Sequence, residues 1–280
     1  MNTALRAAIA GLDRPLGFRE LLTPDGYNPK LKKGRARGYA SAILHFAPAD
    51  LSGYDVCQYR SAGCTAACLN TAGHGGIIRK GQTTNPVQLA RIARTVLFFE
   101  HRAIFNDLLV DAIEQHVRRS IKRGLTPVVR LNGTSDLPWH MLKLNNGRTV
   151  MDTFPTVTFY DYTKHPQRAA LRTLPANYSL TFSRSETNDD DVRRILARGG
   201  NVAVVFATGR TRPLPLVWHG YRVIDADRDD LRFLDPRNVV VGLRAKGKAR
   251  GEASGFVEDP DADTACWPID PERDCVAHAA

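Results

Sequence analysis

The chain has 280 residues, of which 43% are hydrophobic, and it carries a formal net charge of +10. This apolar content excludes wholesale disorder and is enough for one large domain or two modest ones. No apolar run approaches the roughly 18 residues that a membrane-spanning helix needs, and the N-terminus lacks the apolar core of a secretion signal, so we expect a cytoplasmic protein with no membrane partner.

The beginning of the chain predicts an arm, a strand and a cysteine-rich loop. Residues 1–38 form the arm, which contains a basic loop from Lys30 to Arg37. The sequence GYASAILHFAP at 38–48 predicts the first strand, which the proline closes. The stretch VCQYRSAGCTAACLNTAGHGG at 56–76 follows, and its glycines let the backbone turn tightly, as a loop requires.

The strongest helical pattern follows this loop and extends to Lys122. Asn85 suits the N-cap, Pro86 suits the first helical position, and Gly124 suits the residue after the helix end. We expect two helices, or one bent helix, with the break between Glu100 and Arg102. The row that the four-residue spacing places on the buried face is Phe105, Leu109, Ile113, Val117 and Ile121.

In the remainder of the chain, short apolar runs alternate with helix-like segments such as 165–172 and 188–198. Near-continuous apolar runs are typical of strands buried on both faces of a parallel sheet. The alternation predicts an α/β fold, and we expect a partial, TIM-barrel-like parallel sheet built from βα units. The expected organisation is the arm at 1–38, a single barrel-like domain at 39–250 and a tail with two cysteines at 251–280.

Each of the apolar runs ends in a cluster of polar residues. The densest clusters are 132–136 (NGTSD), 161–164 (DYTK) and 183–188 (SRSETN). Because sites in parallel α/β proteins form at the carboxyl ends of the strands, we expect these clusters to share one site.

Three of the five cysteines follow a C-x6-C-x3-C pattern: Cys57, Cys64 and Cys68. Three thiolates from one loop can hold three irons of a [4Fe–4S] cluster. They can equally supply three of the four ligands of a zinc ion, with His74 or a distant cysteine as the fourth. Cys266 and Cys275 complete such a site or pair with each other, and a third interpretation is that the cysteines are structural.

The cysteine loop after a first strand, followed by βα units, resembles the radical S-adenosylmethionine (SAM) superfamily. The motif of that family is C-x3-C-x2-C with an aromatic residue before the last cysteine, whereas here both spacings are longer and Ala67 precedes Cys68. The segments C…AGC…CLNTAGHG, VRLNGTSD and FYDYTK resemble the phage "gene 88 product" family more closely, over roughly residues 30–190. This second resemblance implies a phage or prophage origin and carries no established activity.

The resemblance to radical SAM enzymes implies roles for the polar clusters. The three cysteines would bind the cluster, and the open iron would be chelated by SAM. Residues implied to bind the amino group, ribose or carboxylate of SAM are Asn132, Gly133, Thr134, Ser135, Ser183, Ser185, Glu186 and Asn188. Residues implied to face the substrate are Tyr160, Tyr162 and Lys164.

Two carboxylates are candidates for catalysis in their own right. Asp136 is a base, a nucleophile or a ribose ligand, or it caps the next short helix. Asp161 and Lys164 form an acid–base pair, or a buried structural ion pair. Tyr160 and Tyr162 point to the same face of their strand, where they stack a base or pack in the core.

Several separate basic segments account for the positive charge, and they favour a polyanionic partner over a merely solvated surface. The sequence therefore predicts first a radical SAM-like enzyme with a [4Fe–4S] cluster that modifies nucleic acid or a nucleotide-like substrate. A second interpretation is a base-exchange transglycosylase with structural zinc and either Asp136 or Asp161 as its nucleophile. A third is a zinc-stabilised nucleic-acid-binding or host-takeover protein without enzymatic activity.

Overall fold

The structure, a computed structural model, describes residues 3–13, 15–27, 29–77, 85–171, 173–209, 212–262 and 266–267. The chain divides into two compact units. The first unit contains residues 1–58, 70–161 and 173–179, and the second contains 59–69, 162–172 and 180–280. Each unit is described by itself.

The first unit is built on three parallel strands and one antiparallel strand. Strands β2 (Tyr39–Leu44), β3 (Thr126–Arg130) and β4 (Thr158–Thr163) lie side by side in parallel, with Val129 opposite Phe159. Strand β1 (Leu22–Pro24) pairs antiparallel with β2. The buried residues alternate little along β2, which is typical of a strand covered on both faces.

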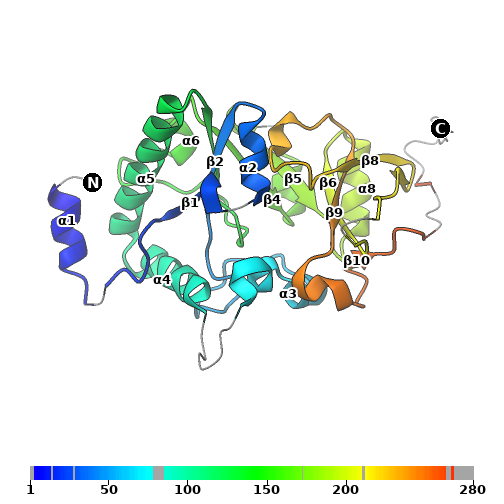
Figure 1. Cartoon of the computed structure of the whole chain (residues 1–280), viewed down its shortest axis with the longest axis horizontal. Coiled ribbons are helices and arrows are strands. Elements are labelled where there is room, and N and C mark those ends of the chain that lie inside the picture. The colour runs from blue at the N-terminus through cyan, green and yellow to red at the C-terminus, as the bar shows by residue number, and fades with distance from the viewer. Residues whose placement is uncertain are drawn as a thin grey trace. The chain divides into compact units, whose positions relative to one another are not determined.

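The helices of the first unit are α1 (Thr3–Ala10), α2 (Pro29–Arg35), α4 (Pro86–Glu100), α5 (Arg102–Lys122) and α6 (Val150–Thr153), with short 3-10 turns at Asp25–Tyr27 and Gly73–Gly76. Figure 1 shows α5 lying against α1 and α4. A cluster of aromatic rings fills the core beside α4 and α5, with centroids 5.1–6.4 Å apart: Phe46, Phe98, Phe105 and Trp139.

The predicted pair of helices is confirmed, including the break between them. The Asn85 side chain accepts a hydrogen bond from the Val87 amide (2.8 Å), and Pro86 is the first helical residue. His101 interrupts the helix with a φ of −130°. Gly124 follows the second helix with a φ of +66°, a conformation that glycine adopts without strain.

The predicted buried row along α5 is correct only in its first part. Phe105, Leu109 and Ile113 are fully buried, whereas Ile121 is 66% exposed. Residues four apart are rotated by more than one helical turn, so a row drawn at four-residue steps drifts around the helix. By Ile121 the row has left the buried face, and Ser120 occupies it instead.

The second unit is a parallel sheet that ends in a hairpin. Strands β5 (Tyr178–Ser183), β6 (Val202–Phe206), β9 (Val240–Arg244) and β8 (Tyr221–Asp225) are parallel neighbours in that order. Strand β7 (Val217–Trp218) pairs antiparallel with β8, and β10 (Val257–Glu258) runs parallel to β6.

The helices of the second unit are α3 (Ala62–Ala66), α7 (Pro166–Ala169) and α8 (Asp189–Ala197), with 3-10 turns at Arg232–Leu234 and Gly247–Gly251. Three aspartates occupy the first turn of α8, where they complement the positive end of the helix dipole. The apolar face of α8 packs onto the sheet in a core that includes Phe182, Val192, Leu196, Val204 and Phe206.

The fold is therefore mixed α/β with a mostly parallel sheet, as the sequence predicts. The described strands form open sheets, and the expected barrel is not confirmed. Antiparallel strand β1 ends the run of parallel pairs in the first unit, and antiparallel β7 ends it in the second. Among the helices of the described ranges, none is long and apolar enough to cross a membrane.

Candidate functional site

The first part of the cysteine loop lies at the carboxyl ends of β2 and β3. The Asp136 amide donates a hydrogen bond to the Val56 carbonyl (2.8 Å), which joins this loop to the one after β3. Next to this contact, the Cys57 Sγ lies 3.9 Å from the Thr134 carbonyl oxygen. The first predicted metal ligand is thus in contact with the predicted cofactor loop of the same unit.

The loop after β3 uses most of its polar side chains to hold its own shape. The Asn132 Oδ1 accepts hydrogen bonds from the Ser135 hydroxyl (2.9 Å), the Leu137 amide (2.9 Å) and the Trp139 indole (3.2 Å). The Thr134 hydroxyl donates to the Phe46 carbonyl (2.6 Å). The side chains of Asn132, Thr134 and Ser135, which were predicted to bind a cofactor, therefore have internal partners.

Gly133 allows a close approach of two backbones. A Cβ at this position would lie 2.5 Å from the His45 Nδ1 and 2.6 Å from the Leu44 carbonyl oxygen. No side chain larger than hydrogen fits there, because real Cβ contacts are not that short. The glycine was predicted to permit contact with a cofactor, and the structure shows a contact with the end of β2.

Asp161, a predicted catalytic residue near the end of β4, has an exposed fraction of 0%. Its carboxylate accepts hydrogen bonds from the Asn132 amide (2.6 Å) and the Tyr178 hydroxyl (3.0 Å). Burial raises the pKa of Asp161 to about 7, although the two hydrogen bonds act to lower this pKa. The nearby carboxylate of Asp136 also acts to raise it. Asp161 thus joins β4 to the loop after β3, and Asp136 is half-buried beside it.

In the second unit, Glu186 holds the other part of the cysteine loop. Its carboxylate accepts hydrogen bonds from the Ser61 hydroxyl (2.7 Å) and the Gly63 amide (2.7 Å). The Ser61 hydroxyl in turn accepts from the Cys64 amide (3.1 Å) and so caps α3. Partial burial acts to raise the pKa of Glu186, but the hydrogen bonds from Ser61 and Gly63 lower it below its usual value. Glu186 was predicted to bind SAM, and both of its oxygens contact the loop.

Cys64 packs on an apolar cluster at the carboxyl ends of β6 and β9. This cluster contains Ala67, Ala245, Ala249 and Phe256. In the described part of the chain, the three loop cysteines are half-buried thiols that form no disulfide.

The predicted three-cysteine site draws on both units, since Cys57 belongs to the first and Cys64 and Cys68 belong to the second. Within the described ranges, no group of three or more His, Cys, Asp and Glu side chains is arranged to hold a metal ion. The metal site therefore stays a prediction. Cys266 is disulfide-bonded and so offers no free thiol to this site, and Cys275 lies outside the described residues.

Lys164 and Ser183 form the most direct contact between two predicted site residues of the second unit. The Lys164 Nζ donates a hydrogen bond to the Ser183 Oγ over 2.9 Å, and it lies 5.3 Å from the centre of the Phe256 ring. Both residues are half-buried, and they stand at the carboxyl ends of β4 and β5. This arrangement fixes a positive charge and a hydroxyl side by side.

The other predicted residues after β5 form a local turn. The Asn188 side chain accepts from the Ser185 amide (2.7 Å) and donates to the Ser183 carbonyl (3.1 Å). Ser185 is only 2% exposed. Ser185 and Asn188 therefore shape the backbone that carries Ser183 and Glu186.

The two tyrosines of β4 differ in their exposure. Tyr160 has an exposed fraction of 0%. Tyr162 is half-buried and packs against a core cluster that contains Ala203, Ala226 and Val241.

Sequence reasoning missed Arg184, which is buried directly after β5. Its guanidinium pairs with Glu258 (2.6 Å) and Asp189 (3.0 Å) and also donates to the Gly255 carbonyl. No local pattern marks it, because its partners come from α8, from β10 and from the segment that leads into β10. Arg184 holds that segment in place. Phe256, in the same segment, contacts Lys164 and belongs to the cluster on which Cys64 packs.

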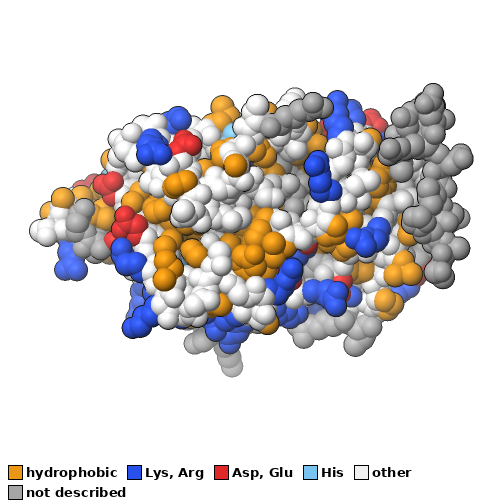
Figure 2. Space-filling view, turned by 90° about the horizontal axis from the view of Figure 1, so that it is seen from above, with side chains coloured by type: hydrophobic (Ala, Val, Ile, Leu, Met, Phe, Trp, Pro, Cys, Tyr) orange, Lys and Arg blue, Asp and Glu red, His pale blue; other side chains and the backbone are white. Residues whose placement is uncertain are grey.

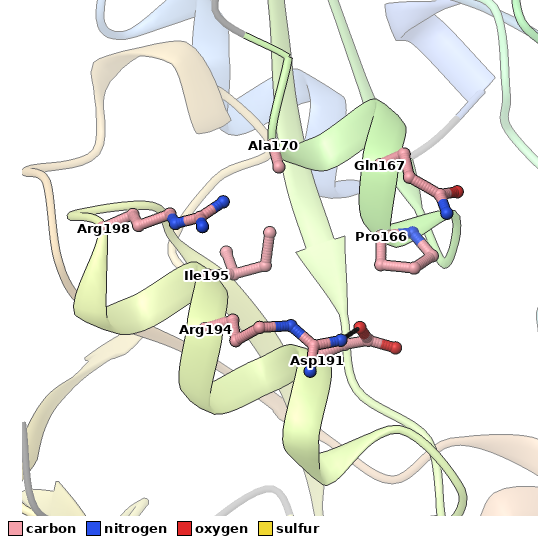
Figure 3. A pocket seen from close by; sticks show the side chains of 7 residues that line it. All are labelled: Pro166, Gln167, Ala170, Asp191, Arg194, Ile195 and Arg198. Carbon is pink, nitrogen blue, oxygen red and sulfur yellow. Dashed lines mark hydrogen bonds and ion pairs between the residues drawn. The ribbon is translucent and has the colours of Figure 1, made fainter.

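A small hollow of about 150 Å³ lies between α7 and α8 (Figure 3). Arg194 is paired there with Asp191, and Ile195 lies between the side chains of Arg194 and Arg198. Ligand pockets measure roughly 300–1,000 Å³, and no predicted site residue lines this hollow. We therefore place the candidate site at the strand ends.

On the face that Figure 2 displays, the positively charged side chains do not gather in one patch. Lys and Arg side chains stand there in several separate places. This distribution agrees with the scattered basic segments of the sequence.

Comparison with known proteins gives one match. No curated protein and no solved structure matches the chain, so the likeness to radical SAM enzymes gains no support. The model of the family described as Gene product 88 matches residues 20–260, a longer stretch than the segments that carried the resemblance. With most of its length covered by this match, the chain belongs to the Gene product 88 family.

Proposed function

We propose that this chain is an enzyme that modifies nucleic acid or a nucleotide-like substrate, with a [4Fe–4S] cluster held by Cys57, Cys64 and Cys68. The observation that supports the proposal is the course of the cysteine loop. In the first unit Cys57 lies against the loop after β3, and in the second Cys64 packs at the ends of β6 and β9. Carboxyl ends of parallel strands are where α/β proteins build their sites.

The thiols fit a cluster better than they fit a structural disulfide. They form no disulfide, and thiolates are the usual ligands of iron–sulfur clusters. The apolar surroundings of Cys64 suit a centre whose potential depends on exclusion of water. The chemistry that such a cluster supplies when bound is one-electron reduction of SAM, which is the cosubstrate that this proposal implies.

In this proposal, one polar residue of the chain binds the substrate and another positions the cysteine loop. Lys164 binds an anionic group of the substrate, and its hydrogen bond to Ser183 holds the ammonium in place. Glu186 is a positioning residue, because its carboxylate fixes Ser61 and Gly63 and thereby the helix that carries Cys64.

The base-exchange alternative is less well supported. A nucleophilic carboxylate must reach its substrate, whereas Asp161 is fully buried and hydrogen-bonded at both oxygens. Asp136 is the remaining nucleophile for that chemistry. A zinc ion in place of the cluster, with or without enzymatic activity, is an outcome of the experiment below.

The proposal is tested with protein purified without oxygen. The wild-type chain and Tyr27→Ala, a control outside the loop, are expected to absorb near ~400 nm, as thiolate-bound clusters do. Cys57→Ala, Cys64→Ala and Cys68→Ala are each expected to lose this absorption. Cleavage of SAM after addition of dithionite is expected only in the two proteins that absorb. Colourless wild-type protein, or colour that survives Cys64→Ala, would contradict the proposal.

A further inference from the structure

An aromatic pair lies beside Lys164 in the second unit. The rings of Tyr59 and His165 are stacked at a tilt of 32°, with centroids 4.1 Å apart. Tyr59 belongs to the cysteine loop, and His165 directly follows Lys164. The pair therefore joins the loop to the end of β4, where the candidate site lies.

Hydrogen bonds at or near the two residues hold their rings in place. Two residues after Tyr59, Ser61 is fixed by its hydrogen bond to Glu186 (2.7 Å). The His165 Nδ1 accepts a hydrogen bond from the Arg168 amide (3.4 Å) and so caps α7. A ring that is already positioned loses little conformational freedom when a ligand stacks on it.

Tyr59 is nevertheless 43% exposed, so much of its ring faces solvent. The tyrosines of β4 are less exposed. Tyr160 has an exposed fraction of 0%, and Tyr162 is half-buried against a core cluster. A flat ligand near Lys164 can therefore stack on the Tyr59 ring of the aromatic pair.

We propose that Tyr59, supported by His165, is a stacking platform for an unpaired nucleobase, and that Lys164 contacts the phosphate beside that base. A planar base gains roughly 1–3 kcal/mol by stacking on an aromatic side chain, whatever its identity. A neighbouring ammonium adds a contact that depends on salt. This inference rests on the proposed function, since it specifies the substrate of the same site as a single-stranded nucleic acid or a free nucleotide.

The test is the binding of fluorescein-labelled oligothymidylate, followed by fluorescence anisotropy. A matched probe has the same phosphates but abasic sugars. Tyr59→Ala is expected to weaken binding of oligothymidylate about tenfold and to leave binding of the abasic probe unchanged. Tyr59→Phe, which keeps the ring, is expected to bind like the wild type. Tyr27→Ala removes a more exposed tyrosine (73%) of the first unit and is expected to change nothing.

Competition with thymidine monophosphate identifies the source of the base. If thymidine monophosphate displaces the probe from wild-type protein but not from Tyr59→Ala, the platform accepts free nucleotides. If it displaces the probe from neither protein, the platform requires a polynucleotide. Equal affinity of Tyr59→Ala and wild type for oligothymidylate would overturn the inference, as would the absence of oligothymidylate binding by the wild type. The iron content of the same samples separates this result from the proposed function, because the cluster can be present while the platform is absent.

Discussion

The Lys164 ammonium donates a 2.9 Å hydrogen bond to the Ser183 hydroxyl, and the two residues come from the carboxyl ends of β4 and β5. This hydrogen bond orients the ammonium, because the hydroxyl oxygen accepts from it. In the proposed function, this ammonium binds an anionic group of the substrate.

The first prediction concerns this charge. Lys164→Met is expected to weaken binding of oligothymidylate and to reduce the slope of log K against log salt by about one charge equivalent. Ser183→Ala keeps the charge and is expected to weaken binding with the slope unchanged. Titrations at several salt concentrations measure both effects. An unchanged slope in Lys164→Met would show that Lys164 does not contact a phosphate.

The second prediction concerns the hold of Glu186 on the cysteine loop. Glu186→Ala leaves the Ser61 hydroxyl and the Gly63 amide without their partner, so a loss of about 1–3 kcal/mol in the free energy of unfolding is expected. The iron bound per chain is expected to fall as well, because Cys64 is displaced. Urea unfolding and iron analysis check these outcomes. The control Glu114→Gln alters an exposed ion pair with Arg118, for which a change below about 1 kcal/mol is expected.

The third prediction concerns space around Gly63. A Cβ at this position would overlap the Ser254 hydroxyl and lie 2.6 Å from the Phe256 Cβ. Gly63→Ala is therefore expected to lower the free energy of unfolding by about 1–3 kcal/mol. Gly251→Ala is the matched control, because no atom of the described residues lies within 4 Å of the place that its added methyl group would take. Equal stability of the two variants in urea would show that the loop does not pack as described.

The fourth prediction follows from Asp25, which is 3% exposed and pairs with Arg35 (2.7 Å) and Arg123 (3.0 Å). Burial acts to raise its pKa, but the hydrogen bonds from both arginines hold the pKa at about 2, below the usual 3.8. Because the folded pKa is lower than the unfolded one, this stabilisation is complete above pH ~4 and is lost as the pH falls towards ~2. It amounts to about 2 kcal/mol.

Asp25→Asn is accordingly expected to cost about 2 kcal/mol at pH 7 and less than half of that at pH ~2.5, as measured by urea unfolding. Asp13→Asn, at an exposed position, is the control. A cost that does not depend on pH would mean that the charge of Asp25 is not what the two arginines stabilise.

The fifth prediction has the opposite sign. Burial raises the pKa of Asp161 to about 7, so the folded state holds its proton more tightly than the unfolded chain. The contribution of Asp161 to stability is therefore fully present below pH ~4 and decreases as the pH rises to about 7. Asp161→Asn cannot titrate, so its stability relative to the wild type is expected to improve over this range. A difference that is constant with pH would contradict the raised pKa.

Much of the fold can be predicted from local sequence. Asn85, Pro86 and Gly124 mark the helix ends because capping depends on a few adjacent residues, and the parallel strands are evident from their apolar runs. Ile121 shows the limit of this reasoning, since its place in a four-residue row did not account for the drift of that row around the helix.

The site was harder to predict, because its polar residues have partners far away in the chain. Glu186 contacts Ser61 across 125 positions, and nothing near either residue identifies the other. Asn132 and Ser135 resemble ligand-binding residues in sequence but hydrogen-bond within their own loop. A cluster of polar residues at a strand end indicates where a site lies, but it does not separate residues that bind a ligand from those that shape the loop.

The central claim is that the cysteine loop holds an iron–sulfur cluster, and analysis of iron, acid-labile sulfide and zinc in protein purified without oxygen tests it most directly. We predict about four irons and about four sulfides per chain, as a [4Fe–4S] cluster requires. Stoichiometric zinc without sulfide would contradict the claim.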